Sequence, residues 1–96
     1  MRFNKDFALD RLSWIAQILE VKNSSMSDDQ AADAAADAVQ RLTEDLELPH
    51  RLRDVGVEKS DFRALAEDAL QDLIVATNPR PVTSPEVVIE LFEQAY

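Results

Sequence analysis

The chain contains a single glycine, Gly56, and no cysteine. Loops that cradle the phosphates of a nucleotide need several glycines, because backbone N–H groups must approach the ligand closely. Disulfides, thiolate metal sites and thiol nucleophiles all need cysteine. The composition therefore excludes a Rossmann fingerprint, a P-loop and cysteine chemistry. A chain without cysteine is also compatible with a cytoplasmic location, which we expect for this protein.

Apolar residues recur at the helical period along most of the chain, and no segment shows the alternation of a strand. The periodic segments predict helices at about 7–20, 27–46 and 49–55, another that begins near residue 58 or 60, and a last one from about 83 to 95. We therefore predict an all-α fold, a small bundle of four to five helices. Its 96 residues suit a single helical domain or subdomain, residues 1–96.

Local signals mark several of the helix ends. Ser27 and Gln30 have the spacing of a capping box, and so do Thr83 and Glu86. Gly56 is expected as a C-terminal cap, where the left-handed backbone conformation favours glycine. Leu48 and Pro49 end the second helix, and Pro49 is expected to open the short third one.

The periodicity also predicts which side chains point inward. These are Ala8, Leu12, Ile15, Ala16, Leu19, Ala31, Ala35, Ala38, Val39, Leu42, Leu46, Phe62, Leu65, Ala66, Ala69, Leu73, Val88, Leu91, Phe92 and Ala95. Ser13 is assigned to the polar arc of the first helix.

A second apolar stripe on the first helix consists of Phe7, Trp14 and Ile18. A helix that is apolar over most of its circumference needs neighbours on two sides. We therefore predict a homo-oligomer that buries this stripe, because an exposed apolar patch of several hundred Å² tends to find a partner. Phe7 and Trp14 could instead stack on a ligand, although interface or core positions are the more common role of such residues.

The net charge is −9, from 19 acidic and 10 basic residues. This surface repels phosphate backbones and anionic lipids, so we expect neither a nucleic-acid nor a membrane partner. No apolar run approaches the roughly 20 residues that cross a bilayer. The first six residues are not followed by an unbroken apolar stretch, so no secretory signal is expected.

Few residues are candidates for chemistry. His50 is the only histidine, and a metal site would need partners of a kind that the chain lacks, so a surface histidine is the favoured interpretation. Carboxylate pairs such as Glu44 and Glu47 are typical of solvated faces. Arg51, Arg53 and Arg63 could belong to a basic patch, although pairing with nearby carboxylates is favoured. We assign no catalytic, cofactor-binding or metal-ligating residue.

Four stretches resemble, in order and spacing, the C-terminal end of the iron-containing (group III) alcohol dehydrogenase family. They are M-R-F-N at residues 1–4, L-P-x-x-L-x-x-x-G-V at 48–57, the helix at 62–70, and A-T-N-P-R-P-V-T at 76–83 with the amphipathic helix that follows it.

The resemblance implies an enzyme larger than this chain. Such enzymes bind NAD(P) in an N-terminal α/β domain and hold iron or zinc through one aspartate and three histidines, upstream of the M-R-F-N stretch. None of these ligands carries over to a residue here, so we expect no cofactor in this chain. Met1 matches an internal methionine of the family, which suggests a truncated gene, an alternative start or a cloned fragment.

The chain departs from the family at two helix ends. Glu20 and Glu47 stand where the family often has glycine. We therefore expect these loops to differ from the family's and the first helix to run longer, since a side chain in a left-handed cap costs on the order of 1 kcal/mol.

Two functional hypotheses follow. The favoured one is a C-terminal helical fragment that is catalytically incomplete and associates with itself. The alternative is a small alcohol dehydrogenase-like protein with residual or acquired oxidoreductase activity as an oligomer.

Overall fold

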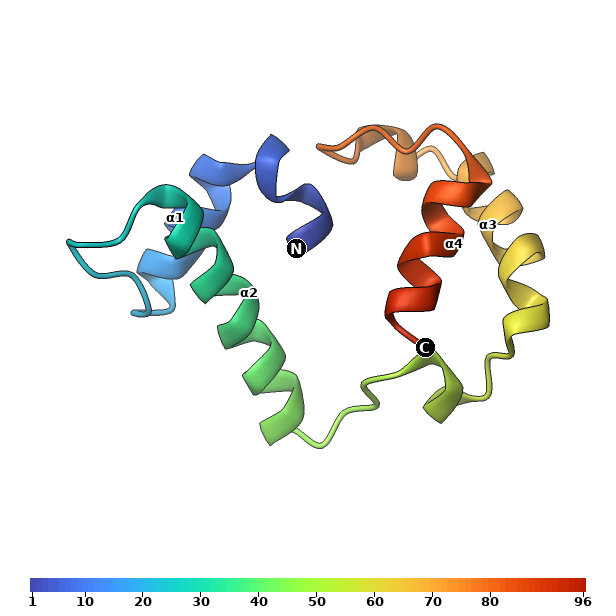
Figure 1. Ribbon diagram of the computed structural model, residues 1–96, viewed down its shortest axis with the longest axis horizontal. Coiled ribbons are helices and arrows are strands. Elements are labelled where there is room, and N and C mark those ends of the chain that lie inside the picture. Colours follow the sequence, from blue (N-terminus) through green and yellow to red (C-terminus); the bar gives the residue numbers. More distant parts are fainter. The chain divides into compact units, whose positions relative to one another are not determined.

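The computed structural model describes residues 1–96 and contains four α-helices, four short 3-10 helices (η1–η4) and no strand (Figure 1). The all-α prediction is confirmed. The chain divides into two compact units, Met1–Leu48 and Pro49–Tyr96. That residues 1–96 behave as one folding domain stays a prediction.

The first unit contains η1 (Arg2–Phe7), α1 (Leu9–Ile18) and α2 (Asp28–Asp45). Its core lies between α1 and α2 and is made mostly of alanine. One cluster joins Ala8, Leu12 and Ala32, and the other joins Ala16, Ala31 and Ala35. Alanine side chains are short, so the two helices can approach closely, as the sequence of α2 predicts.

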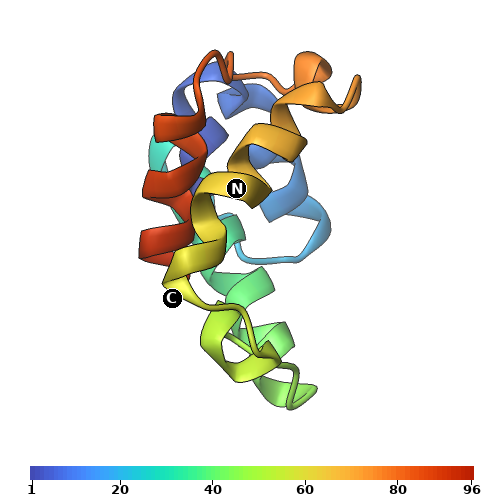
Figure 2. The same cartoon turned by 90° about the vertical axis from the view of Figure 1, so that its right-hand side faces the viewer.

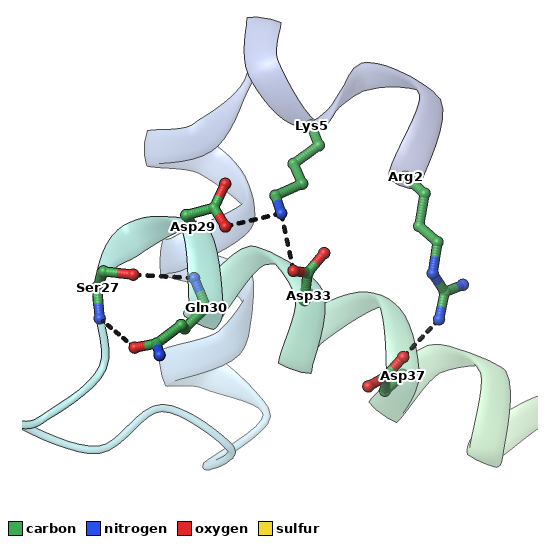
Figure 3. Close-up of polar contacts among 7 residues, drawn as sticks. All are labelled: Arg2, Lys5, Ser27, Asp29, Gln30, Asp33 and Asp37. Carbon is green, nitrogen blue, oxygen red and sulfur yellow. Dashed lines mark hydrogen bonds and ion pairs between the residues drawn. The ribbon is translucent and has the colours of Figure 1, made fainter.

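The capping box at the start of α2 is confirmed. The backbone N–H of Gln30 donates to Ser27 Oγ at 3.1 Å, and the Ser27 N–H donates to Gln30 Oε1 at 3.0 Å (Figure 3). Asp28 and Asp29 occupy the first turn, where a negative charge is favoured by the helix dipole. The capping box and the acidic first turn therefore both favour the start of α2 at Asp28.

The second unit contains η2 (Leu52–Val55), η3 (Lys59–Asp61), α3 (Phe62–Gln71), η4 (Val75–Thr77) and α4 (Pro85–Gln94). Helices α3 and α4 lie side by side (Figures 1 and 2). Phe62 is the centre of an aromatic cluster, with ring centroids 5.4 Å from Phe92 and 5.7 Å from Tyr96. The N–H of Leu52 donates to the carbonyl of Ala95 at 2.9 Å, which ties η2 to the end of α4.

Three helix ends have the same kind of cap, a residue in the left-handed backbone conformation. Glu20, Glu47 and Gly56 have φ of 56°, 53° and 83°. After α1, the Val21 N–H donates to the Ala16 carbonyl at 2.9 Å and the Glu20 N–H to the Gln17 carbonyl at 3.0 Å. This pair of bonds is a Schellman motif.

The same two bonds recur after α2 and η2. They join Leu48 to Thr43 and Glu47 to Glu44, then Val57 to Leu52 and Gly56 to Arg53. The prediction for Gly56 is confirmed. The prediction of a longer first helix is wrong, because α1 ends at Ile18 and Glu20 takes the left-handed conformation that suits glycine.

Several other boundaries differ from prediction. Phe7 ends η1 instead of beginning α1, because the backbone of Ala8, with φ −146° and ψ 31°, interrupts the helix. The short third helix begins at Leu52 and not at Pro49. The N-cap of α4 is Ser84 without a side-chain bond, so the capping box predicted for Thr83 is wrong; Pro85 at the first helical position supports the start instead.

The predicted core is partly confirmed. Leu12, Ala16, Ala31, Ala35, Phe62, Ala66 and Val88 are buried, together with Ala8. Leu42 and Leu46 are exposed, because α2 has 18 residues against 10 in α1 and the alanine clusters occupy its first half. Leu73 lies beyond the end of α3 and is 85% exposed. Leu19 and Leu65 are also exposed, whereas Ser13, predicted to be polar surface, is buried.

Candidate interaction face

An apolar exposed surface of the first unit lies on α1, opposite its core face. Trp14 and Ile18 are each 66% exposed, while Leu12 and Ala16 on the same helix are buried. Residues four apart lie on the same side of an α-helix, so Trp14 and Ile18 form one face. Phe7 is 58% exposed but belongs to η1, outside that helix. All three predicted association residues are thus accessible, and two of them share a helix.

This face carries little charge compared with α2. The only charged residues of α1 are Asp10 and Arg11, one of each sign. Helix α2 carries six acidic residues and one arginine. In a chain of net charge −9, α1 is therefore the helix on which a second acidic molecule would meet the least repulsion.

Two basic residues of η1 contact the acidic side of α2. Lys5 Nζ lies 2.9 Å from Asp29 Oδ2 and 2.7 Å from Asp33 Oδ2, and Arg2 pairs with Asp37 (Figure 3). The hydrogen bonds to Asp33 and then Asp29 raise the pKa of Lys5 above its ordinary value. These pairs were not predicted from the sequence, although the four-residue spacing of Asp29, Asp33 and Asp37 places all three carboxylates on one side of α2.

Ser13 in the middle of α1 forms a second polar cluster with Lys22 and Asp28. Ser13 Oγ, in a residue only 4% exposed, donates to Asp28 Oδ1 at 2.7 Å. Lys22 Nζ donates to Ser13 Oγ at 2.6 Å and to Asp28 Oδ1 at 2.9 Å. These bonds satisfy the buried hydroxyl, which explains why Ser13 can face α2.

This cluster does not resemble a hydrolase site in its chemistry. The hydrogen bond from Lys22, and then that from Ser13, lowers the pKa of Asp28 below its ordinary value. The Lys22 ammonium is already protonated and cannot accept a proton from serine, and a carboxylate of lowered pKa is a poor general base. The cluster therefore joins α1, the following loop and α2, and we assign it no catalytic role.

The second unit has its own ion pairs. Lys59 Nζ lies 2.6 Å from Glu93 Oε2 and 5.1 Å from the centroid of the Tyr96 ring. Arg63, a candidate for the basic patch, instead pairs with Glu67 at 2.6 Å and Glu86 at 2.8 Å. The pKa of Glu86 lies below its ordinary value, mainly because its carboxylate accepts a hydrogen bond from its own backbone and then from Arg63.

The side chains of residues 1–96 do not fit an iron or zinc ion. No three histidine, cysteine, aspartate or glutamate side chains converge as a ligand group. His50 is exposed and lies outside every helix. An iron or zinc ion is held by several such donors, which these residues do not bring together.

A nucleotide finds no phosphate cradle in these residues either. Gly56 serves as a helix cap, and a Cβ added to it would meet no atom within 4 Å, so its backbone is not pressed against a binding surface.

No helix combines the length and the apolar character needed to span a bilayer.

Comparison with known proteins decides the family. Residues 1–96 match the family model described as "Fe-containing alcohol dehydrogenase family, C-terminal". The chain belongs to the Fe-containing alcohol dehydrogenase family. Lactaldehyde reductase of Escherichia coli (strain K12) is 43% identical over 96 residues, which are 100% of this chain and 25% of that protein. The 1,3-propanediol dehydrogenase of Citrobacter freundii is 35% identical over 95 residues, or 99% of this chain and 24% of that protein.

Solved structures agree with the family assignment. A crystal structure of 1,3-propanediol oxidoreductase superimposes with a TM-score of 0.92 and 33% identity, covering 99% of this chain and 25% of that one. An alcohol dehydrogenase from Oenococcus oeni gives a TM-score of 0.89 and 31% identity over 98% of this chain and 24% of that one. The chain thus spans about a quarter of the length of the relatives that it matches.

Proposed function

We propose that residues 1–96 form the C-terminal helical part of an NAD(P)-dependent alcohol dehydrogenase and are catalytically incomplete by themselves. The observation that carries this proposal is the coverage: the whole chain matches lactaldehyde reductase, yet it spans only 25% of that protein. Hydride transfer needs a cofactor held against the substrate and, in a metal-dependent enzyme, a polarising ion. The single histidine and single glycine of the chain support the view that both sites need residues from elsewhere.

For the whole protein we propose a small oxygenated substrate. The relatives are named for lactaldehyde and 1,3-propanediol, which are both three-carbon compounds with two oxygens. The helical part would then contribute scaffold to the enzyme and no chemical group to the reaction.

An activity assay tests this proposal. Purified residues 1–96 are incubated with NAD or NADP, 1,2- or 1,3-propanediol, and ferrous iron or zinc, while absorbance at the wavelength of the reduced cofactor is followed. We expect no rate above the protein-free blank. A rate that scales with protein and disappears with a chelator would overturn the proposal and support the alternative, a small alcohol dehydrogenase-like oligomer with its own activity.

We further propose that the chain alone associates with a second copy through the α1 face. Trp14 and Ile18 are two-thirds exposed, and removing such side chains from water on association is favourable by roughly 25 cal/mol per Å². The near-neutral charge of α1 supports this face over the acidic surface of α2.

Light scattering coupled to size-exclusion chromatography tests the association. We expect the double variant Trp14→Gln, Ile18→Gln to lower the measured mass towards that of one chain. The matched control is Leu73→Gln, Ile74→Gln, which removes two apolar side chains that are 85% and 75% exposed in the other unit. A monomer at high concentration, or equal effects of both double variants, would contradict the proposed face.

A cytoplasmic location stays a prediction.

A further inference from the structure

The basic side chains of the 3-10 segment Arg2–Phe7 form ion pairs with α2. None of its residues is buried, and Phe3, Asn4 and Lys5 are half-buried. Its two basic side chains bind three aspartates that follow one another at four-residue spacing on α2 (Figure 3). Arg2 also donates to Gln40 Oε1 at 3.4 Å.

The rest of the unit is held by different contacts. The cluster of Ala16, Ala31 and Ala35, with Ile15 and Val21 against it, includes no residue of the segment. The Ser13, Lys22 and Asp28 cluster joins the middle of α1 to the start of α2. The non-helical backbone of Ala8 separates the segment from α1, and the buried Ala8 side chain packs with Leu12 and Ala32 as part of the helix pair. The α1–α2 pair therefore keeps most of its core when the segment leaves.

We propose that Arg2–Phe7 is a strap that a rise in ionic strength releases from α2 while the α1–α2 pair stays folded. Ion pairs near the surface weaken as the screening length falls from about 10 Å at 0.1 M salt to about 3 Å at 1 M. The apolar contacts between the alanines are not screened. Release would leave the Asp29, Asp33 and Asp37 stripe of α2 without basic partners from its own segment.

Hydrogen exchange tests the strap, because it reports opening segment by segment. The Asn4 N–H donates to the Met1 carbonyl and the Ala8 N–H to the Lys5 carbonyl, both within the 3-10 turns of the segment. A detached helix this short is unstable in water, so both amides should lose protection when the strap opens. Between 20 and 500 mM NaCl we expect exchange in residues 1–8 to accelerate about three- to tenfold, and in residues 31–36 less than about twofold. A synthetic peptide of residues 1–8 corrects for the effect of salt on the exchange chemistry.

Two variants make the test specific. Lys5→Gln should reproduce the fast exchange of residues 1–8 at low salt and remove most of the salt dependence, and Arg2→Gln should do the same to a smaller degree. Lys59→Gln, which removes the same charge from the other unit, should change nothing in residues 1–8. The proposal fails if exchange there ignores salt and Lys5→Gln, or if residues 31–36 accelerate in parallel, which would mean that the strap and the helix pair open together.

Discussion

The two units of the chain are stabilised in different ways. Met1–Leu48 brings two helices together over alanines and adds an outer set of ion pairs. Pro49–Tyr96 packs two ten-residue helices around one buried ring, Phe62, with Phe92 and Tyr96 against it. Small side chains contribute little apolar area each and depend on close helix approach. A large ring contributes much area at one point, so the two units should fail under opposite substitutions.

Removal of the Phe62 ring should have the largest effect on stability. Phe62 is 3% exposed, so Phe62→Ala should cost about 3–5 kcal/mol and leave the second unit largely unfolded. Hydrogen exchange should accelerate throughout residues 49–96. Leu73→Ala, at a highly exposed apolar position, is the matched control and should stay within about 0.5 kcal/mol. Normal protection of residues 49–96 in Phe62→Ala would show that the aromatic cluster does not hold this unit.

A substitution of the opposite kind, from a small to a large side chain, should destabilise the first unit. Ala35 is fully buried between α1 and α2, so Ala35→Leu should cost about 1–3 kcal/mol by forcing the helices apart. Urea unfolding followed by circular dichroism measures the loss. Ala64→Leu adds the same side chain at an exposed site of α3 and should be nearly neutral. If both variants were equally stable, the close approach of the two helices would not be the basis of this core.

Substitutions at the three left-handed helix caps should change the stability of the two units by smaller amounts. Glu20→Gly and Glu47→Gly should each stabilise the first unit by about 0.5–1 kcal/mol, because glycine adopts positive φ without steric cost. Gly56→Ala should destabilise the second unit by about 1 kcal/mol for the converse reason, since a Cβ there meets no neighbouring atom and only the backbone conformation opposes it. Denaturant midpoints measure all three, and destabilisation by Glu20→Gly would contradict the steric account.

The pH dependence of the first unit should be the smallest effect. The pKa of Asp28 is lowered in the folded state by Lys22 and Ser13, so its contribution is present above the ordinary carboxyl range and is lost as pH falls below about 4. The pKa of Lys5 is raised, so its contribution is complete at neutral pH and is lost as pH rises through its elevated pKa, on the alkaline side.

Thermal unfolding of Asp28→Asn at pH 3 and pH 7 checks the acid limb. The difference in stability between the variant and the parent should be smaller at pH 3 than at pH 7. Asp68→Asn, on an exposed position of α3, is the matched control. A constant difference between Asp28→Asn and the parent at both pH values would show that protonation of Asp28 is not the cause.

Local signals in the sequence determined much of this fold. The 3.6-residue periodicity predicted the all-α class, the Ser27 and Gln30 pair predicted the start of α2, and the lone glycine predicted a left-handed cap. These features depend on residues within a few positions of one another, so they can be predicted without knowing which elements pack together. The ordered stretches that resemble the family were equally local, and the family they suggested is confirmed.

Only the tertiary structure decided the rest. Glu20 and Glu47 adopt positive φ because the following segments must turn back, and the Schellman bonds hold them there against their own preference. Ser13 is buried because Lys22 and Asp28 satisfy its hydroxyl, which the polarity of serine alone does not indicate. Leu42 is exposed because α1 is too short to cover it. For Ser13 and Leu42 the deciding partner lies in another element, and a pattern confined to one element carries no record of it.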